Sequence, residues 1–321
     1  MKPLRMSFTA GLALAGLLAL PFGLPAPAQA AEKTAVTLGT ATPGGGFQLF
    51  GAALAPVVNA TDASLDLQPV GTKGSGENLK RLAAGTLDTA LVAGVPAYEA
   101  LAGAGREKLD LRIISAIYSS FGLFAVRGDS PARTFDDLVG RKVSWGTRSS
   151  GLTSLGGYVA EALDLDKDKD FQAVYLEKAG QGAPMVLGGE VAAQWGGGIG
   201  WPNFTKITEA GGRLVGLTPA QVAKVNARFP FLKPYTLAPG SYPGQTEPVL
   251  SVAAWSFILA RRDLPDDVAY RLAKALHKGN KALAEKLEQG RETTPQNTRD
   301  GALTPDLIHP GVMKYLKEIG L

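Results

Sequence analysis

The chain contains no cysteine and only two histidines, His277 and His309, both close to its C-terminal end. The absence of cysteine excludes disulfides, thiol nucleophiles and every metal site built on thiolates. Neither histidine lies near a serine and a carboxylate in a pattern typical of catalysis. We expect His277 to be a surface or packing residue of a helix and His309 to cap the start of one.

Long runs of one charge are also missing. The 33 lysines and arginines exceed the 29 acidic residues by only four, and no block of five like charges occurs. A nucleic-acid partner is therefore not expected. A hydrophobic content of 45% with 19% charged residues excludes a disordered chain and allows a sizeable core.

The one long apolar run lies at the start of the chain. Basic residues precede an apolar stretch over residues 7–20, and residues 28–30 read Ala-Gln-Ala, a small-x-small cleavage signal. We predict a secretory signal peptide over residues 1–30, cut near Ala30 and Ala31, and a mature protein in a bacterial periplasm. An uncleaved anchor is the alternative, but the run is shorter than the roughly 20 residues that a span needs.

The sequence carries none of the common motifs for nucleotide binding or serine catalysis. The chain has no phosphate-binding Gly-x4-Gly-Lys-Ser/Thr, no Gly-x-Gly-x-x-Gly and no Gly-x-Ser-x-Gly. Residues 164–170 resemble the start of a calcium loop, but Lys169 replaces its glycine and Tyr175 its bidentate glutamate, which indicates a solvated turn. We expect no cofactor, no metal and no enzyme activity. A secreted enzyme, using a residue such as Glu77 or Glu177, remains an alternative.

Strand and helix patterns alternate along the rest of the chain. Apolar strand patterns lie at residues 34–40, 64–70, 88–93, 111–117, 121–127, 141–145, 171–176, 191–195 and 249–257. Helical patterns lie at residues 48–60, 77–84, 152–163, 218–228 and 312–319, with the longest following Leu264. Residues 230–244, rich in proline and glycine, read as a loop. This alternation predicts an α/β fold of mostly parallel sheets covered by helices, arranged as two domains.

Glycine is abundant, at 40 of 321 residues against a typical content of about 7%. Its clusters follow predicted strands, at residues 44–46, 71–76, 146–151 and 196–200. Strand ends of this kind face the crevice where open α/β sheets bind ligands. Glycine lets backbone N–H groups approach a ligand, and a following helix adds its positive N-terminal end. Four such loops predict a binding site for a small anionic or zwitterionic organic solute.

Several segments in order resemble TAXI-type solute receptors, the periplasmic proteins of one class of tripartite ATP-independent periplasmic (TRAP) transporters. They are GTATPGGGFQLFG at 39–51, TKGSGENL at 72–79, LAAGTLD at 82–88, SSG at 149–151, PGSYPGQ at 239–245, and HPG at 309–311 with Tyr315 and Gly320. The resemblance implies a two-lobed type II periplasmic binding protein fold with two hinge strands, near residues 123–127 and 249–254. It also implies a first lobe of residues 31–127 plus 248–321 and a second of residues 128–247.

The same resemblance implies a receptor that encloses a small carboxylate, such as glutamate or 2-oxoglutarate, and delivers it to TRAP membrane permease subunits. A sensory protein that reports to a membrane kinase is the alternative that uses the same lobes. The candidate ligand-binding residues are Thr42, Gly45, Gly46, Phe47, Gln48, Lys73, Gly74, Ser75, Arg148, Ser149, Ser150, Trp195 and Gly197.

Some positions depart from the family pattern. Phe47 and Gln48 stand where the family usually has two tyrosines, and Ala93 and Val95 replace its usual polar pair. Arg148 offers either a bidentate contact to a carboxylate or an ordinary surface charge. Trp195 and Trp201 flank the last glycine loop and can wall the pocket. For Trp201 we expect core packing, because Pro202 follows it at a helix start.

Overall fold

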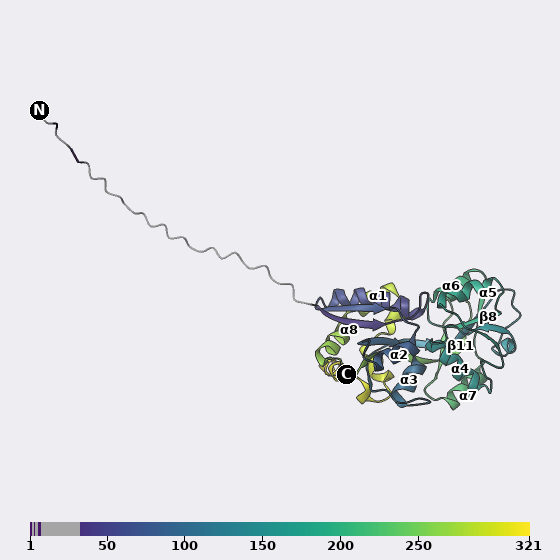
Figure 1. Cartoon of the computed structure of the whole chain (residues 1–321). Coiled ribbons are helices and arrows are strands. Elements are labelled where there is room, and N and C mark those ends of the chain that lie inside the picture. Colours follow the sequence, from purple (N-terminus) through teal and green to yellow (C-terminus); the bar gives the residue numbers. More distant parts are fainter. Residues whose placement is uncertain (2, 4–5, 8–32) are drawn as a thin grey trace. The chain divides into compact units, whose positions relative to one another are not determined.

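The computed structural model describes residues 1, 3, 6–7 and 33–321. Apart from those first four residues, the predicted signal peptide lies outside the described part of the chain. Residues 33–321 form one compact unit built on two sheets, each surrounded by helices (Figure 1). The predicted α/β class is thus confirmed. Within the described residues, no helix combines the length and the apolar character needed to cross a membrane.

The first lobe, as we call the part around the larger sheet, has six strands. They are β1 (Thr34–Gly39), β2 (Leu65–Val70), β3 (Thr89–Val92), β4 (Leu111–Phe121), β10 (Lys233–Leu237) and β11 (Val249–Arg261). β1 pairs in parallel with β2 and β3, whereas β11 runs antiparallel to β3, β4 and β10. The helices of this lobe are α1 (Gly46–Thr61), α2 (Ser75–Ala83), α3 (Gly94–Ala102), α8 (Asp266–Lys286), α9 (Pro295–Gly301) and α10 (Pro310–Glu318).

The second lobe is built on five strands in the order β7-β6-β8-β5-β9. They are β5 (Leu123–Val126), β6 (Lys142–Ser144), β7 (Gln172–Val174), β8 (Ala193–Gly196) and β9 (Arg213–Val215). Its helices are α4 (Gly151–Ala162), α5 (Gly182–Leu187), α6 (Pro202–Glu209) and α7 (Pro219–Arg228). An aromatic core fills it, in which Phe124 contacts both Trp145 and Trp195.

The chain passes between the sheets at Gly122. β4 ends in the first sheet at Phe121, and β5 begins in the second at Leu123. The chain therefore enters the second sheet at Leu123, before residue 127, where the resemblance placed the end of this part of the first lobe. The long strand β11 pairs with β10 near its start and with β4 and β3 near its end.

Several elements escaped the sequence analysis, namely β9, β10, α3, α5 and α9. Two of them, β10 and α3, show why. β10 lies within the segment that we predicted as a loop, because Pro234 argues against a strand. Of the strands described, only β11 pairs with it, and such an edge position tolerates proline. β10 also places part of the segment predicted as second lobe in the first sheet. α3 was not assigned, yet Pro96 falls in its first turn, where the missing N–H of proline costs nothing.

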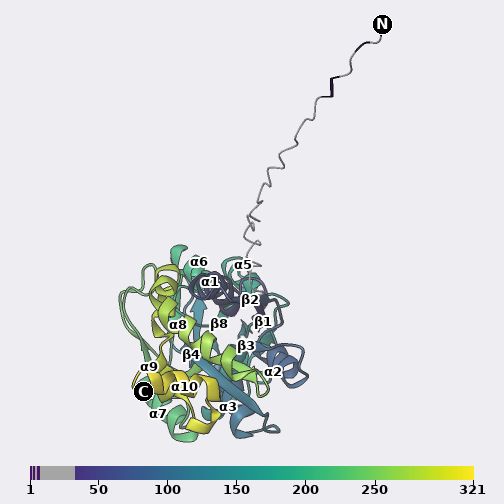
Figure 2. The same ribbon diagram turned by 90° about the vertical axis from the view of Figure 1, so that its left-hand side faces the viewer.

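One core of the first lobe involves α2 and α3, and the larger one lies between the sheet and helices α1, α8 and α10. α8 carries Leu272 and Leu276 into this core, as the four-residue spacing predicts. α10 packs beside α8 (Figure 2), and His277 of α8 bonds the hydroxyl of Tyr315 over 2.7 Å. The expectation for His277, a residue of a helix surface, is confirmed.

His309 caps α10, as predicted. Its Nδ1 accepts a hydrogen bond from Gly311 N–H, and its Nε2 lies 2.9 Å from the carbonyl of Leu264. This pairing requires the neutral ring with its proton on Nε2, because a second proton would face the Gly311 donor. Burial lowers the pKa of His309 below its usual 6.5, more than the Leu264 carbonyl and Asp266 raise it.

We expect this histidine to make the protein less stable in mild acid. Since its pKa is lower in the folded than in the unfolded state, its contribution is complete above about pH 6.5 and is lost as pH falls further. Melting temperatures at pH 7.5, 6.0 and 5.0 should decline less steeply in His309→Asn, which keeps a capping side chain. Equal slopes for both proteins would contradict this assignment.

Candidate functional site

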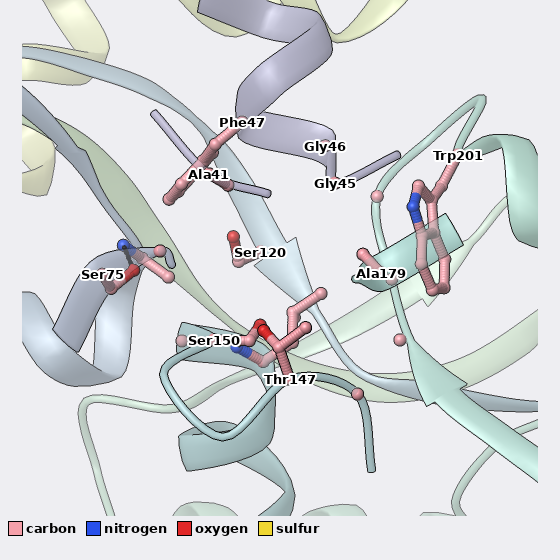
Figure 3. Close-up of a pocket in the computed structure, with 18 of the residues that line it drawn as sticks. Ala41, Gly45, Gly46, Phe47, Ser75, Ser120, Thr147, Ser150, Ala179 and Trp201 are labelled. Carbon is pink, nitrogen blue, oxygen red and sulfur yellow. Dashed lines mark hydrogen bonds between the residues drawn. The ribbon is translucent and has the colours of Figure 1, made fainter. Parts of the chain in front are cut away.

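A cavity lies between the glycine loops of the two lobes (Figure 3). From the first lobe it is lined by the loop that enters α1, the loop that enters α2, and the end of β4. From the second lobe it is lined by the loop that enters α4, by Ala179, and by the end of β8 with the segment that follows. The centre of a water molecule can occupy about 80 Å³ of it. One water needs about 10–15 Å³ by this measure, so a small organic molecule fits.

Three helices begin at this cavity. Gly46 opens α1, Ser75 opens α2 and Gly151 opens α4, and all three residues line the cavity. The first N–H groups of a helix have no acceptor within it, and its N-terminal end carries a partial positive charge. Ser150 caps α4 by accepting from Leu152 N–H over 3.2 Å. The arrangement provides backbone donors for a negatively charged group.

The charged side chains around the cavity have one sign. Lys73 lines it, and no Asp or Glu does so among the described residues. The phenol of Tyr118 also lines it; burial, and to a lesser extent the charge of Glu292, raises its pKa, so it stays neutral. Among the described residues no group of three or more acidic or histidine side chains is placed to hold a metal.

The lobes meet at two rims of the cavity. At one rim, the indole N–H of Trp201 donates to the carbonyl of Gly44 over 3.0 Å, and Ala179 N–H donates to the hydroxyl of Thr42 over 3.3 Å. At the other rim, Gly76 N–H donates to the carbonyl of Ser149 over 3.1 Å. Both rims are bridged, so the cavity lies between lobes that are in contact on two sides of it.

Most of the predicted site residues line this cavity. Those that do are Thr42, Gly45, Gly46, Phe47, Lys73, Gly74, Ser75, Ser150, Trp195 and Gly197. Gln48, Arg148 and Ser149 do not. Gln48 follows Phe47 in α1, and one residue turns the side-chain direction by about 100°. Ser149 contributes its carbonyl to the rim described above.

Arg148 is exposed and does not reach the cavity. Its guanidinium stacks on the ring of Tyr175, 3.8 Å from the ring centre. A flat cation over an aromatic face is a favourable contact in itself. Of the two interpretations offered by the sequence, the structure places Arg148 in the surface one.

Trp195 and Trp201 both line the cavity, and both also pack against aromatic side chains of the second lobe. Trp195 is packed in the aromatic core and donates its N–H to the carbonyl of Leu152 over 2.7 Å. Trp201 packs on Phe204, as predicted, but also lines the cavity and bridges to Gly44. Figure 3 shows its indole beside Ala179, across from the loop that carries Gly45 and Gly46.

Sequence reasoning missed several lining residues. Tyr118 and Ser120 lie near the end of β4, where polar side chains interrupt an apolar strand. Gln194 interrupts β8 in the same way. A polar residue inside a strand that is otherwise buried was the available signal. Thr147 comes from a loop and Ala179 from a single 3-10 turn, and no periodic pattern places side chains in such short segments.

Known proteins resemble this chain in sequence and in fold. A family model described as NMT1-like matches residues 38–320. A structure described as a periplasmic transporter covers 89% of this chain and 92% of its own at 15% identity, with a TM-score of 0.54. A Bordetella bronchiseptica protein covers 89% of each chain at 14% identity, with a TM-score of 0.56. The aliphatic sulphonate-binding protein SsuA of Escherichia coli is 19% identical over 88% of this chain and 82% of its own, with a TM-score of 0.49.

These likenesses concern the fold, and the two-lobed fold of periplasmic binding proteins predicted from the sequence is confirmed. The family match extends over nearly all of the described unit, from β1 to the end of α10. The chain belongs to the NMT1-like family.

Proposed function

We propose that this protein is a periplasmic receptor that encloses one small organic anion or zwitterion between its lobes and delivers it to a TRAP-type permease. One observation carries the binding part of the proposal: three helix N-termini and Lys73 converge on a cavity between the lobes that no described carboxylate lines. Such surroundings favour a carboxylate or a sulfonate over a neutral or cationic solute.

The aromatic walls suit the rest of the solute. Phe47 and Tyr118 meet edge to face with ring centres 6.1 Å apart, and Trp201 lies on the other lobe. Small-molecule sites combine an apolar lining with a few placed polar groups, and this cavity has that composition. The solute therefore carries its charge at one end and carbon atoms beside these rings.

The permease partner rests on the resemblance to TAXI-type receptors in the glycine loops. In this proposal the permease recognises the surface that the two lobes form together once they have closed around the solute. Uptake of the solute into vesicles that contain the permease subunits, with and without the receptor, tests this part. Binding without any effect on uptake would favour a sensory role instead.

A thermal-shift screen of the mature protein tests the binding part. The panel contains carboxylates, sulfonates, amino acids and neutral sugars. A solute present at a hundred times its Kd stabilises the folded state by about 2.7 kcal/mol, enough to raise the melting temperature by several degrees. If no anion raises the melting temperature, or if only a sugar does, the proposal is contradicted.

Lys73→Met is expected to weaken binding of an anionic solute about threefold to tenfold, because the variant loses the one cation that lines the cavity among the described residues. The effect should shrink at high salt, since the Lys73 side chain is exposed. Lys80→Met is the matched control: Lys80 is an exposed lysine of α2 that does not line the cavity. Isothermal titration calorimetry at two salt concentrations gives the Kd of each variant. An equal change of Kd in Lys73→Met and Lys80→Met would contradict a role for Lys73.

A further inference from the structure

Gln194 is a buried amide at the wall of the cavity. It lies on β8, its side chain is fully buried, and it is one of the residues that line the cavity. Its Nε2 group has no hydrogen-bond partner among the described residues. Buried polar groups in native proteins nearly always have a partner, so this donor needs an explanation.

The orientation of the Gln194 amide follows from its neighbour Asn203. The Nδ2 group of Asn203 donates to the carbonyl of Ala179 over 2.7 Å and to Oε1 of Gln194 over 3.1 Å. The carbonyl only accepts, which fixes the Asn203 amide, and the Asn203 donor then requires the oxygen of Gln194. Nε2 is therefore the free end.

The backbone holds this amide in place. α5 begins at Gly182, where a Cβ would lie 2.1 Å from both Cδ and Nε2 of Gln194. Only a glycine allows this approach. With α5 on one side and Asn203 of α6 on another, the Gln194 amide is a fixed donor.

The charges around the cavity do not suit an ammonium ion. Its lining includes serine and threonine hydroxyls, which can accept hydrogen bonds, but no described Asp or Glu supplies a negative charge. A carboxylate or sulfonate accepts hydrogen bonds from the helix N-termini, Lys73 and the Gln194 amide, whereas an ammonium group would lie near the like charge of Lys73 without a carboxylate partner.

We propose that Nε2 of Gln194 donates a hydrogen bond to an oxygen atom of the solute, and that the solute is a small organic oxyanion without an ammonium group. This inference rests on the proposed receptor function and narrows it. The shared chemistry is that of a carboxylate or a sulfonate, and the hydroxyl or keto oxygen of the same molecule is a second acceptor.

Probes that differ in one group test the solute class. Each set keeps the carbon skeleton: alanine, lactate and pyruvate; glutamate, 2-hydroxyglutarate and 2-oxoglutarate; taurine and isethionate. Calorimetry should show at least tenfold tighter binding for the oxygen-bearing member of whichever set binds. Tighter binding of an amino member would overturn this inference and leave the receptor intact. If no probe binds, the proposed function falls with it.

Two variants test the donor itself, with the tightest probe of that panel. Gln194→Leu removes the N–H at nearly constant volume, and we expect its Kd to rise about tenfold or more. Gln194→Glu places a carboxylate there, which should abolish binding at pH 8. At pH 5.5 the buried carboxyl group is expected to take up a proton and offer an O–H, so that binding partly returns.

The controls separate the donor role from folding. Gln172→Glu makes the same change at an exposed residue of the second lobe and should bind like the wild type at both pH values. Within the described part of the chain, Lys73 and Tyr118 are the titratable side chains that line the cavity, and both are present in every variant. A folded Gln194→Leu protein with wild-type Kd would overturn the inference. If Gln194→Leu does not fold, a Kd of Gln194→Glu that is the same at pH 5.5 and pH 8 would overturn the inference instead.

Discussion

Gly151→Ala is expected to weaken solute binding about tenfold or more without lowering the stability of the protein. Gly151 is the first residue of α4 in the second lobe. A Cβ at this position would lie 2.3 Å from Cβ of Ala93 and 2.9 Å from the hydroxyl of Ser75, both in the first lobe. Since real Cβ atoms do not approach so closely, the lobes have to stay further apart.

The stability should not fall, because Gly151 has ordinary helical geometry and is absent from the glycines of positive φ. Alanine in a helix is favoured over glycine by about 1 kcal/mol. Gly157→Ala is the matched control on the same helix, since its Cβ would meet only the side chain of Lys167, at an ordinary 3.6 Å or more. Calorimetry gives the affinities, and small-angle scattering with saturating solute reports whether the lobes close.

A second-site change identifies the contact. Ala93→Gly removes the methyl group that the new side chain meets, and glycine is acceptable at this position, the N-cap of α3. The double variant Gly151→Ala with Ala93→Gly should recover much of the lost affinity. Equal losses in Gly151→Ala and Gly157→Ala, or no recovery in the double variant, would contradict this account of closure.

The sequence predicts those parts of the site in which the backbone of a glycine loop lines the cavity. The loops before Gly46, Ser75 and Gly151 were found because glycine follows a strand and precedes a helix in each. That pattern is local, and parallel strands bring such loops to one edge of a sheet. This local pattern was therefore enough to predict the loops that line the cavity, although the predicted site residues are fewer than half of its lining.

Side chains whose place depends on tertiary packing were less predictable. Arg148 had an aromatic partner, Tyr175, that no spacing rule identifies. The orientation of the Gln194 amide depends on Asn203 and Gly182, which lie on other elements and cannot be paired with it from the sequence. The same holds for the fold: the strand patterns predicted most strands, but β10 depends on pairing with a distant partner, β11.

Gly122→Ala is expected to lower the free energy of unfolding by about 3 kcal/mol, the upper end of the usual cost of overpacking a core. At Gly122, where the chain changes sheets, a Cβ would lie 2.1 Å from Cζ2 of Trp195. That indole cannot retreat easily, because its N–H is bonded to Leu152 and its ring contacts Phe124 with centres 5.0 Å apart.

Chemical denaturation measures the loss, with Gly71→Ala as the control, since no atom lies within 4 Å of the Cβ it would add. Combining Gly122→Ala with Trp195→Phe should cost less than the sum of the two single changes, because the smaller ring leaves room for the methyl group. Additive losses would place the strain outside this contact. A Gly122→Ala protein as stable as Gly71→Ala would mean that the backbone at the crossing shifts freely, so that Trp195 does not fix the path of the chain between the two sheets.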